Sequence, residues 1–241
     1  MQKFIAEESF WKLFPDSEIG LIVVRNMKTA DEVSDEDQAE IADRLKKAND
    51  AADNHLESDT ISENEVVRVW REAYRQFKTK KGARSSVENL LKRVLKGNPV
   101  GNITPSVDLY NIISLTYALP VGGEDINSFV GDVRLGVTEG GDDFWPLGED
   151  KEEPTLPGEV CYRDDKGAIC RCWNWRDGVR TALSDDARDA LLIIENVDAR
   201  RSDDLHAALD ELAELIKRYL GATIERKEII TQSNPEMVLV D

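Results

Sequence analysis

Residues Thr104–Pro120 read TPSVDLYNIISLTYALP, the most informative stretch of this 241-residue sequence. A threonine followed by a proline is typical of a helix start, because proline suits the first helical position. Nearly every side of the resulting helix is apolar, which predicts that it is buried. Three polar residues nevertheless recur at every third position along one side: Asp108, Asn111 and Ser114.

Two interpretations of this polar row stay open. Buried polar groups are costly unless they form hydrogen bonds. The row therefore either bonds to neighbouring backbone groups or lines a pocket and binds a polar ligand. Sequence alone gives these two interpretations about equal weight.

Working outward from this helix, the sequence predicts an α+β fold in which N-terminal helices pack on a mixed or antiparallel sheet. The segment Ile19–Val24 is typical of a buried strand. Helical patterns begin near Ser34, Ser62 and Ser85, each with an acidic residue three positions later, as in a capping box. Short strand-like segments follow, and a last amphipathic helix begins at Ser202. The expected strands are Val133–Thr138, Phe144–Leu147, Glu159–Arg163, Ala168–Trp175 and Ala190–Val197.

The whole chain, residues 1–241, is expected to form a single unit, with residues 222–241 as a tail that carries an edge strand. The formal net charge of -17 argues against a general nucleic-acid binder and against DNA as a partner. No apolar run reaches the length that spans a bilayer, and no secretory signal is visible. A cytoplasmic protein without a membrane partner is expected, with Cys161, Cys170 and Cys172 reduced. Their spacing does not suggest a metal site.

A basic island contrasts with the acidic whole. Between residues 68 and 96, ten lysines and arginines stand against only two glutamates. Such a cluster could receive phosphates, although a solvated helix face would show the same pattern. The candidate phosphate-binding residues are Arg71, Arg75, Lys80, Lys81 and Arg84.

Two further motifs contain candidate substrate-binding residues. In Cys172–Arg176, a strand would place Trp173 and Trp175 on one face, where they either pack in the core or wall a cleft, with Asn174 and Arg176 on the other. The turn Glu139-Gly140-Gly141 adds a carboxylate beside two glycines that permit close approach of a ligand. No phosphate-binding loop, nucleophile elbow or dinucleotide fingerprint occurs, so no cofactor is expected. Any hydrolysis would rely on a positioned water.

Several of these motifs together resemble a known family. The proline-led helix with Asp108 and Asn111, closed by Leu119-Pro120, is similar to a stretch of the phenylalanyl-tRNA synthetase beta subunit, in its central B-three/B-four domain. The wider pattern over residues 65–197 resembles free-standing members of the same family. It comprises Trp70-Arg71, Arg84–Val87, Pro120–Gly123, Glu139–Gly141 and Trp173–Arg176.

This resemblance implies an α+β editing domain that hydrolyses tyrosine wrongly attached to the phenylalanine tRNA. The sequence departs from the synthetase pattern at Tyr110, where threonine is typical, and at Trp173–Arg176, which replaces a glycine-rich segment. Three hypotheses follow. The first is a tRNA-linked protein that binds the aminoacyl end and hydrolyses mischarged aminoacyl-tRNA. The second is a non-catalytic module that binds an amino acid or aminoacyl-nucleotide, or serves as a protein-interaction domain. The third, ranked last, is an unrelated enzyme that pairs Asp108 with Glu139 as acid and base.

Overall fold

The computed structural model describes residues 1–241, and its strands form two sheets. The central sheet has the order β3-β8-β2-β9 and is antiparallel throughout. Its strands are β2 (Glu18–Arg25), β3 (Val121–Asp125), β8 (Ala190–Asn196) and β9 (Thr223–Ile230). The outer sheet has the order β10-β1-β4-β5-β6-β7 and is mixed, because β1 and β4 run parallel. Its strands are β1 (Gln2–Ala6), β4 (Val133–Val137), β5 (Val160–Asp164), β6 (Gly167–Arg171), β7 (Arg176–Asp177) and β10 (Glu236–Val240).

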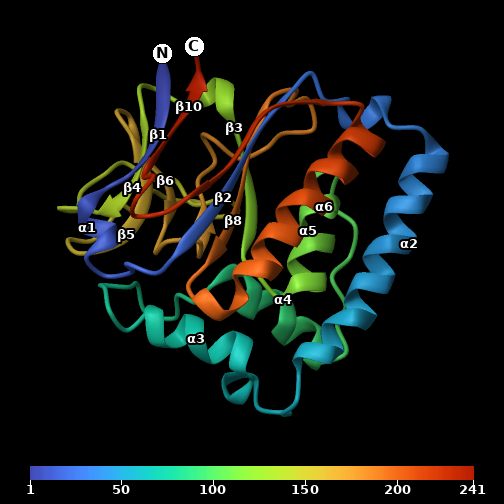
Figure 1. The fold of residues 1–241 in the computed structure, drawn as a ribbon, viewed down its shortest axis with the longest axis horizontal. Coiled ribbons are helices and arrows are strands. Elements are labelled where there is room, and N and C mark those ends of the chain that lie inside the picture. The colour runs from blue at the N-terminus through green and yellow to red at the C-terminus, as the bar shows by residue number, and fades with distance from the viewer.

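The helices cover one face of the central sheet and one end of the molecule (Figure 1). The central sheet lies between the outer sheet and the helices α2, α5 and α6, while α3 and α4 lie across the lower end in this view. The helices are α1 (Glu8–Trp11), α2 (Asp35–Ala52), α3 (Glu65–Ala73), α4 (Ser86–Leu95), α5 (Pro105–Tyr117) and α6 (Ser202–Leu220). Short 3-10 turns cover Ala30–Glu32, Asp53–His55, Ile61–Glu63, Ile126–Ser128 and Ala199–Arg201.

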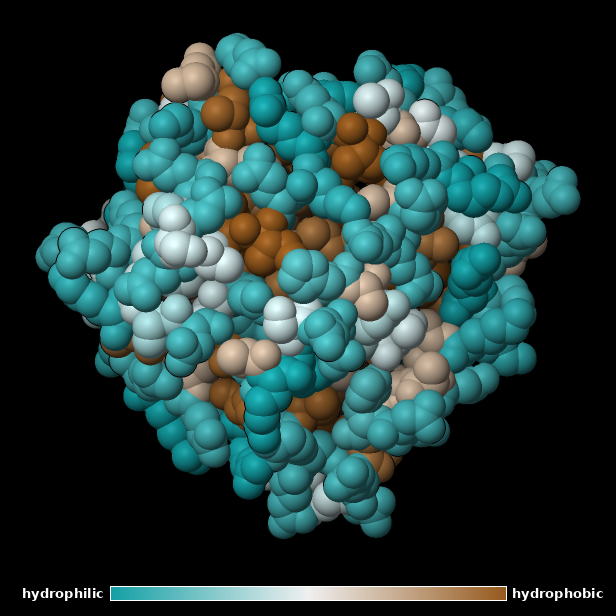
Figure 2. All heavy atoms as spheres, viewed as in Figure 1, coloured by the Kyte–Doolittle hydropathy of each residue, from teal (hydrophilic) through white to brown (hydrophobic).

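The two middle strands of the central sheet, β2 and β8, are covered on both faces, which explains their mostly apolar sequences. All seven residues of β8 are buried, as are the six inner residues of β2. Gly20 of β2 lets α6 pack closely, since a side chain there would meet Leu209 at 2.9 Å. One cluster of 60 buried apolar residues runs through both sheets and the helices. Figure 2 shows the resulting surface as largely hydrophilic, with hydrophobic residues in small separate groups.

Local signals in the sequence account for several element ends. The Ser34 hydroxyl accepts from the Asp37 N–H at 3.2 Å and caps α2, as predicted. Thr104 Oγ1 accepts from Val107 N–H at 3.4 Å at the start of α5. Asp165 and Lys166 form the hairpin turn between β5 and β6, two of the expected strands.

Other predictions are wrong in detail. Helix α3 begins after Asn64, not Ser62, and the carboxylate of Glu88 pairs with Arg71 instead of capping α4. Phe144–Leu147 is no strand and contributes only an isolated bridge from Pro146. The strand expected over Ala168–Trp175 stops at Arg171, because the next two residues adopt left-handed backbone angles. The short strands β1, β3 and β10 were not predicted. None of the helices combines the length and apolar character that crossing a membrane requires.

Candidate functional site

A pocket lies between the two sheets, on the face of the central sheet that turns away from α5 and α6. It encloses about 580 Å³ of empty space, a figure that includes the part open to solvent. Side chains of a strand alternate between the faces of a sheet. Consequently Leu191, Ile193 and Glu195 of β8 line the pocket from one side, next to Gly122 and Glu124 of β3. Tyr162, Ile169, Cys170 and Asp177 line it from the outer sheet.

Glu195 is a buried carboxyl in the pocket wall that accepts two side-chain hydrogen bonds. It is only 3% exposed, accepts a hydrogen bond from the Tyr162 hydroxyl at 2.6 Å and another from Asn174 Nδ2 at 2.8 Å. Burial raises the pKa of this carboxyl to about 7, against a partial offset from these donors and the nearby Trp173 indole. A carboxyl with this pKa exchanges protons readily near neutral pH, which suits a general acid or base.

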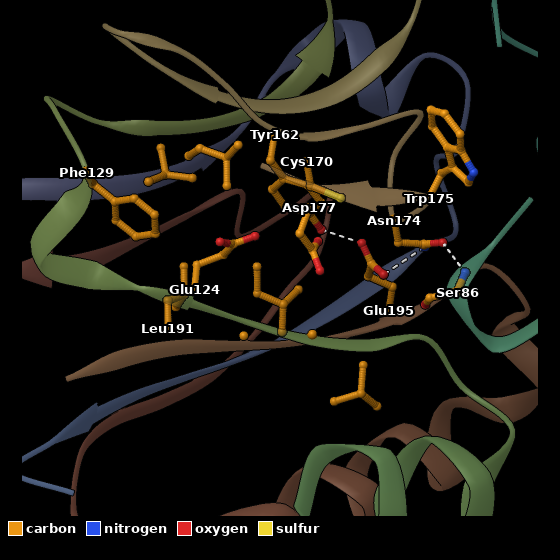
Figure 3. A pocket seen from close by; sticks show the side chains of 16 residues that line it. Ser86, Glu124, Phe129, Tyr162, Cys170, Asn174, Trp175, Asp177, Leu191 and Glu195 are labelled. Carbon is orange, nitrogen blue, oxygen red and sulfur yellow. Dashed lines mark hydrogen bonds between the residues drawn. The ribbon is translucent and has the colours of Figure 1, made fainter. Parts of the chain in front are cut away.

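Two further carboxyls turn into the same interior, as Figure 3 shows. Burial first, and then the charge of Asp177, raises the pKa of Glu124 far above its usual range. Asp177 is partly exposed to solvent. Its carboxyl is nevertheless desolvated by the surrounding protein, and this desolvation raises its pKa as well. The pocket is therefore acidic in composition, with its carboxyls held toward their protonated forms.

A strained turn after β6 presents Asn174 to the pocket. Cys172 and Trp173 have φ angles of 47° and 65°, a conformation that non-glycine residues rarely adopt. Trp173 is held there by an aromatic cluster, with ring centroids 4.6 Å from Phe14 and 5.0 Å from Trp70. Asn174 then bridges three elements. Its Oδ1 accepts from the Tyr74 hydroxyl at 3.0 Å and from the Ser86 N–H at 3.2 Å, while its Nδ2 holds Glu195.

A cationic groove adjoins the pocket. Arg71, Arg75 and Arg84 line it together with Tyr74, whose hydroxyl bonds to Asn174 in the pocket wall. Arg71 forms a two-point ion pair with the buried Glu88 at 3.1 and 2.6 Å, and Arg84 lies 3.7 Å from the same carboxylate. The groove and the pocket thus share one wall.

The remaining candidate phosphate-binding residues lie around this groove. Lys80 pairs with Glu153, and its ammonium lies 5.6 Å from the ring centroid of Trp175, which lines the pocket. Arg75 and Lys81 are exposed and form no ion pair. Arg75 and Lys80 therefore lie near the wall that the groove shares with the pocket.

The polar row on α5 lies apart from the pocket. Asp108 accepts from the Ile103 N–H and from Asn102 Nδ2, both at 2.8 Å, and faces a separate shallow hollow beside α2. The Ser114 hydroxyl donates to the Leu119 carbonyl at 2.6 Å. Asn111 is buried and makes no hydrogen bond with its side chain. None of these three lines the inter-sheet pocket.

The other predicted substrate-binding residues also occupy different places. Glu139 and Gly141 are exposed, and Gly140 packs in the same turn against Pro157. Trp173 is fully buried in the aromatic cluster rather than lining the pocket. Arg176 stacks over the Trp175 ring at 5.4 Å. Of the nine predicted substrate-binding residues, the structure places only Asn174 in the wall of the inter-sheet pocket.

Sequence reasoning missed the three pocket carboxyls. Glu195 interrupts the apolar strand ALLIIEN, which is the kind of signal that drew attention to α5. Glu124 and Asp177 stand near glycine- and arginine-rich segments that give no comparable contrast. No group of three or more His, Cys, Asp or Glu side chains is arranged to hold a metal ion.

The fold and the pocket define an α+β domain with two facing sheets and an acidic site between them. A model of the B3/4 domain matches residues 69–221, well over half of the sequence, so the chain belongs to the B3/4 domain family. The family resemblance and the fold class predicted from sequence are therefore confirmed.

Among solved structures, an N-terminal fragment of the phenylalanyl-tRNA synthetase beta subunit from Pyrococcus horikoshii has the same fold, with a TM-score of 0.50 and 11% identity. The match covers 94% of this chain and 53% of the fragment, so the chain spans about half of the fragment's length. At this identity the likeness establishes the fold alone. No curated protein matches the sequence.

Proposed function

We propose that this chain binds the aminoacyl end of a tRNA and hydrolyses mischarged aminoacyl-tRNA in the inter-sheet pocket. The observation that carries the proposal is Glu195, a carboxyl with a pKa of about 7 inside a pocket whose wall adjoins a cationic groove. The B3/4 family and the synthetase-like fold support tRNA as the class of ligand.

The ligand would lie across the wall shared by pocket and groove. Arg75 and Lys81 would meet terminal phosphates in and beside the groove, since their charges are not taken up by carboxylates. The aminoacyl group would enter past Asn174 and Trp175 into the pocket. Aromatic rings such as that of Trp175 are common stacking partners for the bases of single-stranded ends.

Glu195 would act as the general base. It would take a proton from a water molecule, whose oxygen adds to the ester carbonyl carbon. The bond between that carbon and the ribose oxygen then breaks. The ribose oxygen takes up the proton that Glu195 removed from the water and leaves as a hydroxyl group. Asn174 would orient Glu195 through its 2.8 Å hydrogen bond. General-base catalysis of this kind typically contributes about 10²–10⁴-fold.

The test is deacylation of a panel of mischarged tRNAs by the purified protein. Glu195→Gln keeps the size of the side chain and should lower the rate by at least about 10²-fold. Glu139→Gln, in an exposed turn, is the matched control and should retain full activity. A rate no faster than buffer for every substrate in the panel would reject the proposal.

Asn111→Ala separates this site from the one expected on α5. If the polar row of α5 held the ligand, this substitution would abolish activity. A site in the inter-sheet pocket predicts near-normal activity, because Asn111 does not line that pocket. Loss of activity in Asn111→Ala together with normal activity in Glu195→Gln would move the site to α5.

A non-catalytic module for amino acids or aminoacyl-nucleotides is the second candidate. The net charge of -17 favours it, because such a surface repels RNA at long range. Thermal shift with amino acids, set beside tRNA binding at several salt concentrations, separates the two. Stabilisation by a small ligand without affinity for tRNA selects the module.

A further inference from the structure

Glu124 and Asp177 face the same interior from opposite sheets, Glu124 from β3 and Asp177 from β7 (Figure 3). No Lys, Arg or His nitrogen lies within 4.0 Å of the carboxylates of Glu124, Asp177 or Glu195. The nearest arginines interact with other groups. Arg180 forms a two-point pair with Asp164 at 2.8 Å, and Arg176 stacks on Trp175 while donating to the Leu147 carbonyl.

Glu124 is the carboxyl that most clearly lacks a hydrogen-bond partner. Its side chain belongs to a residue only 4% exposed, and its Oε2 is buried with no hydrogen-bond partner. The Thr181 hydroxyl is near enough to lower the carboxyl's pKa slightly, but it does not complete a hydrogen bond and is itself unpaired. Buried polar atoms are rarely left in this state unless a ligand or water supplies the partner.

The pocket that holds these two carboxyls has mostly apolar walls. Val121, Phe129, Val133, Ile169 and Leu191 line it together with Glu124 and Asp177. An aliphatic chain suits such walls, whereas a polar chain would lose its hydration there. The pocket therefore combines apolar walls with two carboxyls that no cation of the chain pairs with.

We infer that the pocket takes an aminoacyl group whose side chain is an aliphatic stem ending in a protonated amine, bound between Glu124 and Asp177. The inference rests on the proposed function in taking tRNA as the carrier of that group. The chemistry of the side chain is inferred from the geometry of the pocket. Lysine and its shorter homologue ornithine are the side chains of this class.

The number of donors favours an ammonium over a hydroxyl. An ammonium offers three N–H donors and a positive charge, so it can serve both carboxyls at once. A hydroxyl offers one donor and leaves the second carboxyl unpaired. Charge-assisted hydrogen bonds are also about twice as strong as neutral ones. Mutual repulsion of the two carboxyls, which raises the pKa of Glu124, would be relieved by the same cation.

The experiment is calorimetric titration of the full chain with L-lysinamide and with L-norleucinamide. Both probes carry the same α-ammonium and a similar stem, and they differ in the terminal amine. Lysinamide should bind at least about tenfold more tightly, the equivalent of about 1.4 kcal/mol. In Glu124→Gln and in Asp177→Asn the ratio should fall to within about twofold, and Glu57→Gln, at an exposed position far along the chain from the pocket residues, should leave it unchanged.

Gly122→Val tests the location. A Cβ at Gly122 meets nothing within 4 Å, and the residue lines the pocket on the same strand face as Glu124. The valine should occupy ligand space without disturbing the fold, so both probes should lose affinity while the melting temperature holds. Retained binding in this variant would overturn the inferred site.

The outcomes separate this inference from the proposed function. Equal or tighter binding of norleucinamide, or no binding of either probe at millimolar concentration, overturns the inference. Selective binding of lysinamide by a chain that neither binds nor deacylates any tRNA keeps the inference and rejects the proposed function. Deacylation confined to tRNAs whose aminoacyl group has an uncharged side chain keeps the proposed function and rejects this inference.

Discussion

Glu195→Gln is expected to flatten the dependence of stability on pH. Burial, partly offset by hydrogen bonds from Tyr162 and Asn174, raises the pKa of this carboxyl from 4.5 to about 7 in the folded chain. The folded state therefore holds the proton more tightly than the unfolded state. The stability that Glu195 contributes is fully present below pH 4.5 and is lost as the pH rises through 7.

The size of the effect follows from the two pKa values. For one group moving from 4.5 to 7, the free energy of unfolding falls by roughly 2.5 kcal/mol between pH 5 and pH 8. Glutamine keeps the length of the side chain and one acceptor for Tyr162 or Asn174, but it does not titrate. Other groups of this acidic chain titrate in both proteins, so their contributions cancel in the difference between wild type and variant.

Urea unfolding at pH 5, 6, 7 and 8, followed by circular dichroism, measures this difference. The wild type should lose stability relative to Glu195→Gln by about 2.5 kcal/mol across the range. Glu139→Gln, at an exposed position, should run parallel to the wild type. Parallel curves for Glu195→Gln and the wild type would refute a desolvated, proton-holding carboxyl and would remove the basis for Glu195 as general base.

Two further substitutions test the framework of the site. Glu159→Ala leaves the fully buried guanidinium of Arg171 without its two-point partner at 3.0 and 2.5 Å, and should cost about 3–5 kcal/mol in urea unfolding; a loss below about 1 kcal/mol would contradict this account. Gly140→Ala should destabilise the chain more than Gly141→Ala. Both glycines have φ near +85°, but only a Cβ at Gly140 collides with the Pro157 backbone, at 2.5 Å. Equal melting temperatures for the two alanine variants would contradict the collision.

Features encoded locally could be predicted from the sequence. The apolar run of β2, the proline-led α5 and the capped α2 each depend on residues within one or two turns. Trp173 shows where local reasoning stops. Strand alternation predicted that it shares a face with Trp175, but contacts with Phe10, Phe14 and Trp70 hold it at a φ of 65°.

The pocket could not be predicted for a related reason. Its carboxyls come from strands far apart in the sequence, β3, β7 and β8, and they meet only because β3 pairs with β8 while β7 ends the opposite sheet. Asn174 was predicted as a binding residue and does line the pocket, yet its partner Glu195 was not. A carboxylate inside an otherwise apolar strand was the signal available in the sequence.

Under the proposed function, the charges of the groove limit how much of a tRNA this chain can hold. Arg71 is bound to Glu88 and Lys80 to Glu153, and Arg84 lies near the same Glu88 carboxylate. Arg75 and Lys81 remain as free cations among the five candidates. Two phosphate contacts to a single-stranded end give a slope of about -1.4 in a plot of log affinity against log salt. Such a slope is small for an RNA-binding protein.

Under the proposed function, affinity must therefore come chiefly from the aminoacyl group in the pocket. A tRNA carrying a non-hydrolysable aminoacyl amide that fits the pocket should bind at least about tenfold more tightly than the same uncharged tRNA. Arg75→Ala and Lys81→Ala should each lower the salt slope by about 0.7, whereas Lys47→Ala, paired with Asp43 on α2, should not change it. Equal affinity for charged and uncharged tRNA, with a steep salt slope, would show that the chain recognises the tRNA body instead of the aminoacyl end.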